Sequence, residues 1–477
     1  MIIRDEVGVP GLKKFLIFLF LLTPGGLLLP GCGGYSSSGS GSKGSGIKYR
    51  AFVSNSVTGG ASVAGVYIVD AQNDLHPAIS PIAAGNTPGM MVVTPNRNQT
   101  LVFSGNNSQF SDNSFNVIDN ASESNVGHVT LPGFTESFLV SPDSSLAYVA
   151  LPNAPVIGQS PGKIEIVALT SIVSAGEIDI PAVHYLSINN GGSRLLAFSG
   201  SADTTDAPCS AVTPCYMFVV TPSNLGTGNP VVAPIPSNTV NNSLDHPVQA
   251  FFSSDDTTAF VVNCGAECGG TQASVQAFDM TSNTPGTPAP VDAASVALLS
   301  GSTMYLAGTP YADGAPSQPC TGQQTAATTC GLLTVFDLTS MSVVTSGIVI
   351  TDGYHNRIAM GANGQLFIGA RTCTEIIPPQ PPPPGAEIRG CLSVFNTQSV
   401  AVGNIQPGQV TIPPENGDVT GIQPIARRDV VYLIQGQNVQ GGTLYIYDTT
   451  TDAENTVEEQ RLRNLVGGFV DVKTVDF

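Results

Sequence analysis

The chain has 477 residues and a formal net charge of −18. Charged residues make up 11% of it, against about 25% in an average domain, whereas Gly (52) and Pro (36) are abundant and Trp is absent. Nucleic-acid binders carry a basic face, so this acidity argues against a nucleic-acid partner. The length exceeds one ordinary core, and the richness in turn-forming residues favours many short strands.

The N-terminus has the pattern of an export signal. Lys13 and Lys14 precede the apolar run FLIFLFLL, and small residues follow it. The run is too short for a comfortable membrane span. The sequence LPGC that ends at Cys32 resembles the lipobox of bacterial lipoproteins. This resemblance implies cleavage after residue 31, lipid on Cys32 and, because Gly33 is not Asp, sorting to the outer membrane. The alternative is an ordinary secretory signal with an incidental cysteine.

A Gly/Ser-rich segment, GGYSSSGSGSKGSG, follows the lipobox. Such a composition cannot build a core and behaves as a flexible tether with a mean span of about 20 Å. We therefore predict a signal peptide at 1–31, a lipidated cysteine and tether at 32–47, and a folded body at 48–477.

The folded body repeats one pattern: strand A, a tight turn, strand B, a loop, strand C ending in Asp or Asn, and a short strand D. Stretches such as SFLVSPDSSLAYVAL show the A–B hairpin clearly. Internal repeats of this length indicate a repeat architecture. The seven internal units cover residues 88–132, 134–181, 184–236, 247–280, 296–350, 356–396 and 418–448.

The two ends of the chain supply the missing strands of one further unit. Residues 467–477 match a lone strand A, and residues 49–55 and 65–70 match strands B and C. Pairing these ends closes a ring and removes the exposed sheet edges that an open array would leave. The expected fold is all-β, a β-propeller of four-stranded blades, with eight blades favoured and seven as the alternative.

The repeats resemble the YVTN-type β-propeller repeat, whose consensus runs SPDG, then YVTN, then a strand ending VID. The matching stretches are SPDSSLAYVALPN, TTAFVVN, RAFVSN, FNVID and VYIVD. The resemblance covers nearly all of the expected mature chain. A WD40 propeller is disfavoured because there is no Trp. A six-bladed lactonase and a two-domain sandwich are lesser alternatives.

An Asp or Asn ends strand C in most units. A carboxylate at this place can accept backbone N–H bonds in the C–D turn. Recurrence in successive units argues for a structural role, so function should be sought where the units differ. These residues are Asp70, Asp119, Asp279, Asp337, Asn396 and Asp448.

Eight cysteines remain after Cys32, and they form four neighbouring pairs in the B–C loops of four consecutive units. In an exported protein such pairs predict local disulfides, with zinc at the closest pair as the alternative. The loops would share one face, called here the stapled face, with a proline-rich insert at 375–390. The predicted pairs are Cys209/Cys215, Cys264/Cys268, Cys320/Cys330 and Cys373/Cys391.

Candidate binding residues lie where strand A begins, at the expected mouth of the central channel on the stapled face. A His/Glu ring there can bind a metal ion or hold a general base near neutral pH. Arg427 and Arg428 are also expected near this mouth. No nucleophile elbow, phosphate loop or zinc-protease motif occurs, so no catalytic residue, cofactor or metal is assigned. The candidate residues are Glu136, His184, His246, His355 and Arg357.

These observations predict an exported β-propeller anchored by lipid to the outer membrane, periplasmic or surface-facing. Its expected role is to bind or scaffold an unknown protein or small molecule through the stapled face, as a monomer. The alternative is an envelope enzyme of lactonase or hydrolase type with its site at the channel mouth. The propeller fold supports both functions, so the fold does not decide between them.

Overall fold

The computed structural model describes residues 44–56, 63–105, 112–204, 208–222, 230–237, 243–310, 330–373, 391–412, 417–436, 442–455, 462, 465 and 467–476. The chain divides into two compact units, Met1–Gly41 and Ser42–Phe477. All described residues belong to the second unit. The expected signal peptide and Cys32 lie outside the described residues.

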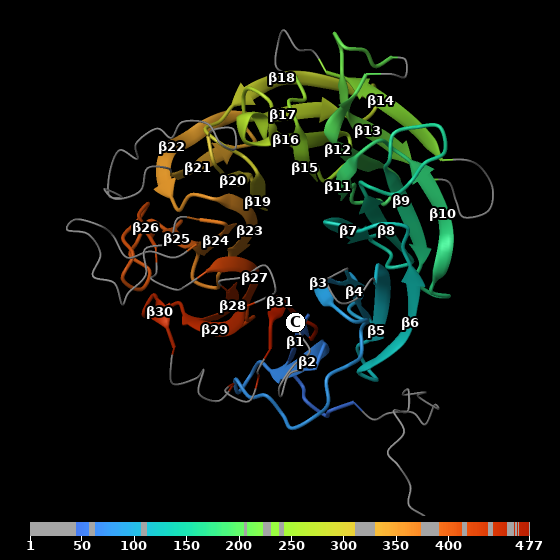
Figure 1. The fold of residues 1–477 in the computed structure, drawn as a ribbon. Coiled ribbons are helices and arrows are strands. Elements are labelled where there is room, and N and C mark those ends of the chain that lie inside the picture. The colour runs from blue at the N-terminus through green and yellow to red at the C-terminus, as the bar shows by residue number, and fades with distance from the viewer. Residues whose placement is uncertain are drawn as a thin grey trace, which may run out of the picture. The chain divides into compact units, whose positions relative to one another are not determined.

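The second unit is built from eight antiparallel sheets, one for each blade (Figure 1). The A strands are β31 (Phe469–Thr474), β3 (Pro88–Val93), β7 (Ser137–Val140), β11 (Val183–Ile188), β15 (Pro247–Phe252), β19 (Val296–Ser300), β23 (Tyr354–Met360) and β27 (Asp418–Pro424). The B strands are β1 (Arg50–Asn55), β4 (Gln99–Ser104), β8 (Leu146–Leu151), β12 (Leu195–Asp203), β16 (Thr258–Asn263), β20 (Thr303–Gly308), β24 (Gln365–Arg371) and β28 (Val430–Gly436).

The outer half of each blade consists of strands C and D. The C strands are β2 (Gly65–Asp70), β5 (Ser114–Asp119), β9 (Lys163–Ala168), β13 (Cys215–Thr221), β17 (Ser274–Asp279), β21 (Gly331–Asp337), β25 (Leu392–Asn396) and β29 (Thr443–Asp448). The D strands are β6 (Ser124–Thr130), β10 (Val173–Asp179), β14 (Val231–Pro236), β18 (Thr284–Pro290), β22 (Ser342–Ile350), β26 (Val410–Thr411) and β30 (Ala453–Glu454). One 3₁₀ helix, η1 (Gly265–Cys268), follows β16.

The ring closes as predicted, with eight blades. The C-terminal strand β31 pairs with β1, which pairs with β2, and these strands form the first blade. Ile82 bridges Val66 where a fourth strand of this blade would lie. Blades two to eight then follow in chain order, with the A strands around the ring axis and the D strands at the rim (Figure 1).

The hydrophobic core is divided among the eight blade–blade interfaces. Strand β1 shows why, because its successive side chains point to opposite faces of the sheet. Ala51 and Val53 pack against the eighth blade, whereas Phe52 packs against the second. Strand β1 is therefore apolar on both faces over these residues, and this explains its continuous apolar run.

Polar side chains join several neighbouring A strands. Backbone N–H groups of one strand donate to side chains of the preceding one, at 2.8 Å for Met91 to Asp471, 3.0 Å for Ala250 to Ser187 and 3.2 Å for Ala297 to Gln249. These bonds satisfy inner-edge N–H groups that have no strand partner. The candidate residues His184, His246 and His355 lie in A strands or directly before one.

The predicted turn role of the strand-C residues is confirmed. Each accepts a backbone N–H bond from a residue two or three positions later, at 2.7–3.2 Å. The members are Asp70, Asp119, Asp279, Asp337, Asn396 and Asp448. These turns, with the A–B turns, form one face of the ring, which we call the turn face. The B–C and D–A connections form the opposite, stapled face.

Candidate functional site

Three of the predicted disulfides are present, and each closes a B–C loop on the stapled face. They are Cys209–Cys215 in the fourth blade, Cys264–Cys268 in the fifth and Cys373–Cys391 in the seventh. Zinc is excluded at the second pair, because disulfide sulfurs are not thiolate ligands. Disulfides persist in oxidising compartments, so these bonds indicate an exported protein.

Two other predicted features of this face lie outside the described residues. One is Cys320, although Cys330 is described and is disulfide-bonded. The other is the proline-rich insert at 375–390.

Glu136 and His184 come together on the stapled face. Glu136 immediately precedes β7, and His184 lies at a bulge of β11, where it leaves the regular pairing with β12. The carboxylate Oε2 and the imidazole Nδ1 are 3.5 Å apart, and the side chains are 52% and 31% exposed. Hydrogen bonding to His184 lowers the pKa of Glu136. An ionised carboxylate can orient the imidazole, as a general base requires.

Two tyrosines meet beside this pair. The hydroxyls of Tyr185 in β11 and Tyr354 in β23 are 2.7 Å apart. These strands belong to the fourth and seventh blades, so the bond joins strands that are not neighbours in the ring. Burial raises the pKa of both phenols, and the carboxylates of Glu136 and Glu267 raise them further. Both hydroxyls therefore stay protonated at neutral pH.

His246 braces a stapled loop. Its Nδ1 lies 3.0 Å from Oδ1 of Asp245, and its ring lies 4.3 Å from that of Tyr216. Burial opposes ionisation of Asp245, but hydrogen bonds from His246, Gln272 and Thr271 lower its pKa to about 2. His246 is only 15% exposed. Asp245 in turn accepts from Thr271 and Gln272 of the loop after η1, so His246 supports this loop only through Asp245 and offers little of its ring to a ligand.

His355 is a core residue. Its side chain is fully buried, and its Nε2 lies 2.9 Å from the carbonyl of Thr351. Burial lowers its pKa to about 4, so the ring is neutral and Nε2–H donates to Thr351. An enclosed imidazole cannot meet a ligand at the channel mouth.

Arg357 joins two blades. Its Nε donates to the carbonyl of Thr420 at 2.7 Å, and its Nη1 donates to the carbonyl of Asn356 at 2.9 Å. The first bond crosses from β23 to β27, so the guanidinium braces the inner edge of the seventh and eighth blades. Buried carbonyls need such donors. This contact accounts for an arginine here without a ligand.

The prediction that Arg427 and Arg428 lie near the same mouth is wrong. Strand β27 extends to Pro424, so both arginines fall in the A–B turn on the turn face. Arg428 pairs there with the buried carboxylate of Asp74 at 2.6 Å. This ion pair links the eighth blade to the first.

Two glycines make room for the rings of His184 and His355, and this packing was not predicted from the sequence. A Cβ at Gly200 would lie 2.5 Å from the ring of His184, and one at Gly331 would lie 2.5 Å from that of His355. Both glycines lie outside the tight turns where a positive φ would require them. A glycine of strand B or C opposite a strand-A histidine is the signal that could have indicated this packing.

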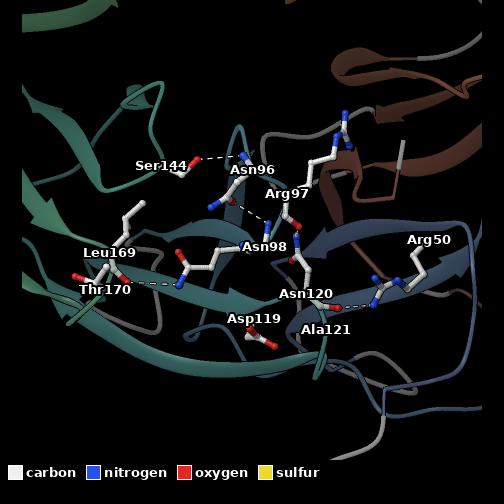
Figure 2. Close-up of a pocket in the computed structure, with 11 residues that line it drawn as sticks. Arg50, Asn96, Arg97, Asn98, Asp119, Asn120, Ala121, Ser144, Leu169 and Thr170 are labelled. Carbon is white, nitrogen blue, oxygen red and sulfur yellow. Dashed lines mark hydrogen bonds between the residues drawn. The ribbon is translucent and has the colours of Figure 1, made fainter. Parts of the chain in front are cut away.

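A polar pocket opens on the turn face between the second and third blades (Figure 2). Its volume is about 460 Å³. Figure 2 shows Ser144, Leu169 and Thr170 of the third blade facing Asn96 and Asn98 of the second across it. Sequence reasoning missed this pocket because its residues come from four different turns and from β1.

Two kinds of feature are absent from the described part of the chain. It holds no group of three or more His, Cys, Asp or Glu side chains placed to bind a metal ion. Within those same ranges, no helix has the length and apolar character of a membrane span.

Fold and site together define an eight-bladed β-propeller with disulfide-closed loops on one face. No family model matches the chain, and no curated protein matches its sequence. Solved structures of several different proteins have a similar fold.

The dihydro-heme d1 dehydrogenase NirN in complex with DHE is similar at a TM-score of 0.52 and 13% identity, over 90% of this chain and 76% of that one. The Dos1 propeller is similar at 0.51 and 8% identity, over 77% and 83%. The periplasmic gluconolactonase PpgL of Pseudomonas aeruginosa has a TM-score of 0.47 and 13% identity, over 89% and 98%. At these identities the likeness shows the fold alone.

Proposed function

We propose that this protein is a lipid-anchored, exported β-propeller of the cell envelope that binds a partner through its stapled face. The observation that carries the proposal is the set of disulfide-closed loops on that face, in the fourth, fifth and seventh blades. A disulfide across so short a loop restricts the shape of the loop, and preformed loops bind with less loss of entropy. The partner is a protein or a small molecule.

Exposed apolar side chains support this choice of face. Ile157 lies in the B–C loop of the third blade, and Val212 lies inside the stapled loop of the fourth. Their side chains are fully exposed and 75% exposed, respectively. Apolar side chains in water favour burial against a partner. Because the two loops belong to adjacent blades, one partner can cover both.

The path of the described chain fits this choice of face. Ser45 donates from its hydroxyl to Glu123 at 2.6 Å, and Ile47 packs between the first and second blades. Glu123 is the last residue of the C–D turn, so the described chain enters the propeller on the turn face, opposite the stapled loops.

We also infer that the repeats are of the YVTN type. The matching stretches FVSN, YVAL and FVVN lie in β1, β8 and β16, which are all B strands. FNVID falls in β5, a C strand that ends at the turn residue Asp119. Equivalent places in the blade are what a true repeat requires.

Lipid anchoring is tested with the full chain expressed in a Gram-negative host fed an alkyne fatty acid. We expect the wild-type protein to carry the label and to fractionate with the outer membrane. Cys32→Ser should lose the label and appear in the soluble periplasmic fraction. An unlabelled wild-type protein, or a labelled Cys32→Ser variant, would contradict the anchor.

The binding face is tested by photo-crosslinking in the same cells. A photoreactive amino acid replaces Val212 on the stapled face or Ser254 in an exposed turn on the turn face. We expect a discrete crosslinked product from position 212 and none from position 254. A product from position 254 alone, or none from either, would contradict the proposal.

The contact of Glu136 with His184 favours a second candidate function, hydrolysis at the channel mouth. His184, oriented by the carboxylate, would take a proton from water as that water attacks a lactone or ester carbonyl. The proton would then pass to the departing alkoxide. A panel of lactones and esters, tested with the wild type and with His184→Gln, decides this. Activity that His184→Gln abolishes supports the enzyme, and its absence from the whole panel contradicts it.

A further inference from the structure

The pocket on the turn face is a separate feature from the stapled face. The second blade contributes its A–B turn, with Asn96 and Asn98, and its C–D turn, with Asn120. The third blade contributes Ser144 and Thr170 from the equivalent turns. Its volume of about 460 Å³ lies within the roughly 300–1,000 Å³ of small-molecule sites.

Some of the lining groups are used to build the pocket. The backbone N–H of Asn96 donates to Ser144 at 3.0 Å and so ties the two blades together. Both ends of the Asn120 side-chain amide are hydrogen-bonded within the protein. Its Nδ2 donates to the carbonyl of Arg97 at 2.8 Å, and its Oδ1 accepts from Thr100 at 2.7 Å. These bonds fix the wall of the pocket before any ligand arrives.

Other lining groups have no protein partner within the described ranges. They are the side-chain amide of Asn98, the Nδ2 donor of Asn96 and the hydroxyl of Thr170. An amide offers a donor and an acceptor in one plane, and a hydroxyl offers both from one atom. Pairs of adjacent ligand hydroxyls match such groups.

The charges of the pocket argue against an ionic ligand. The Arg50 guanidinium, at one end, is paired with Glu123 at 2.9 Å and with Asp476 at 2.6 Å. Asp119 adds a further carboxylate to the lining. An anion would meet the carboxylate of Asp119, and a cation would meet Arg50 and Arg97. A ligand without net charge avoids both costs.

We propose that this pocket binds a neutral saccharide of one or two rings. Hydroxyls around a sugar ring can use the amide and hydroxyl groups of both blades at once. Ala121 gives a small apolar area for the C–H face of a ring, whereas the Leu169 side chain is buried in the core between the two blades. A peptide would need more apolar wall for its side chains than this one residue provides. Recognition rests on Asn98 and Thr170.

The experiment measures saturation-transfer NMR of the full chain with maltose, cellobiose and N,N′-diacetylchitobiose as probes. A glucuronic acid disaccharide and tetra-alanine are the charged and peptide comparisons. We expect at least one neutral disaccharide to bind saturably at millimolar concentration. Asn98→Ala and Thr170→Ala should each weaken its binding about threefold to tenfold, because each removes a neutral hydrogen bond. Thr170→Trp should abolish it by filling the pocket.

Thr281→Ala is the matched control. Thr281 occupies the position of Thr170 in the fifth blade, two residues past strand C, and lies outside the pocket. It should leave binding unchanged. Failure of all three neutral disaccharides to bind would overturn the proposal, as would binding that Asn98→Ala, Thr170→Ala and Thr170→Trp leave intact. Preference for the charged disaccharide or for tetra-alanine would overturn it too.

Discussion

Arg50 and Asp476 lie 426 residues apart in the chain and form a two-pronged ion pair. The guanidinium Nε and Nη2 donate to the two carboxylate oxygens at 2.8 and 2.6 Å, and the backbone N–H of Arg50 donates to the same carboxylate at 2.7 Å. The hydrogen bond to Asp476 raises the pKa of Arg50. This pair fastens the first strand of the ring to the last.

We expect Asp476→Ala to destabilise the propeller by about 2–4 kcal/mol, because it leaves a largely buried guanidinium with one fewer partner. The side chains of Arg50 and Asp476 are 11% and 20% exposed. Urea unfolding measures the change. Glu177→Ala removes the exposed pair with Lys163 and should cost under about 1 kcal/mol. Equal effects of the two variants would show that ring closure does not depend on the ion pair.

The blade pattern could be predicted from the sequence because its determinants are local. A run such as LAYVAL is apolar on both faces, and the Asp or Asn that ends strand C forms its bonds within three residues. The disulfides could be predicted for the same reason, since each partner lies within the same loop. Ring closure could be predicted because strands B and C had no strand A at the N-terminal end, and a lone strand A remained at the C-terminal end.

The candidate site could be predicted only in part, because its contacts join distant blades. Nothing near Tyr185 in the sequence indicates that its hydroxyl meets Tyr354, 169 residues away. His184 and His355 both lie near the start of strand A, yet one is partly exposed and the other fully buried. Which of them faces solvent depends on how neighbouring blades pack, and strand periodicity does not reveal it.

The two disulfides whose loops differ most in length should differ in how much they stabilise the propeller. Cys373–Cys391 closes a separation of 18 residues, and Cys264–Cys268 closes one of 4. Loop-closure entropy gives about 3 kcal/mol for the longer loop and about 2 kcal/mol for the shorter one. Replacing each pair with alanines and measuring urea unfolding should show the larger loss for the longer loop. The opposite order would mean that loop entropy does not set these contributions.

Burial of His355 should make the propeller less stable in mild acid. Its pKa falls from 6.5 to about 4 on folding, so the unfolded chain binds the proton more tightly. The contribution of this residue is fully present above pH 6.5 and decreases as the pH falls toward 4. The total loss is about 3 kcal/mol as an upper limit.

The measurement for this histidine is the free energy of unfolding against pH, for the wild type and for His355→Gln. The glutamine can donate to Thr351 and does not titrate. The difference between the two proteins should narrow as the pH falls from 6.5 to 4. A constant difference between the wild type and His355→Gln would contradict a buried neutral histidine.

The Tyr185–Tyr354 bond should couple the stability of the fourth and seventh blades, which are not neighbours in the ring. Each of Tyr185→Phe and Tyr354→Phe should lower the free energy of unfolding by about 0.5–1.5 kcal/mol, and the double variant should lower it by less than the sum, because the same bond is lost in all three.

The two phenols should also make stability depend on pH. Both have a raised pKa in the folded protein, so the tyrosines of the unfolded chain ionise first as the pH rises. Their contribution is present below pH 10 and is lost as the pH rises further, and the double variant should lose less stability there. Tyr305→Phe, in the sixth blade, is the control, since no hydrogen bond of its hydroxyl occurs in the described ranges. Additive costs would mean that the two hydroxyls act separately.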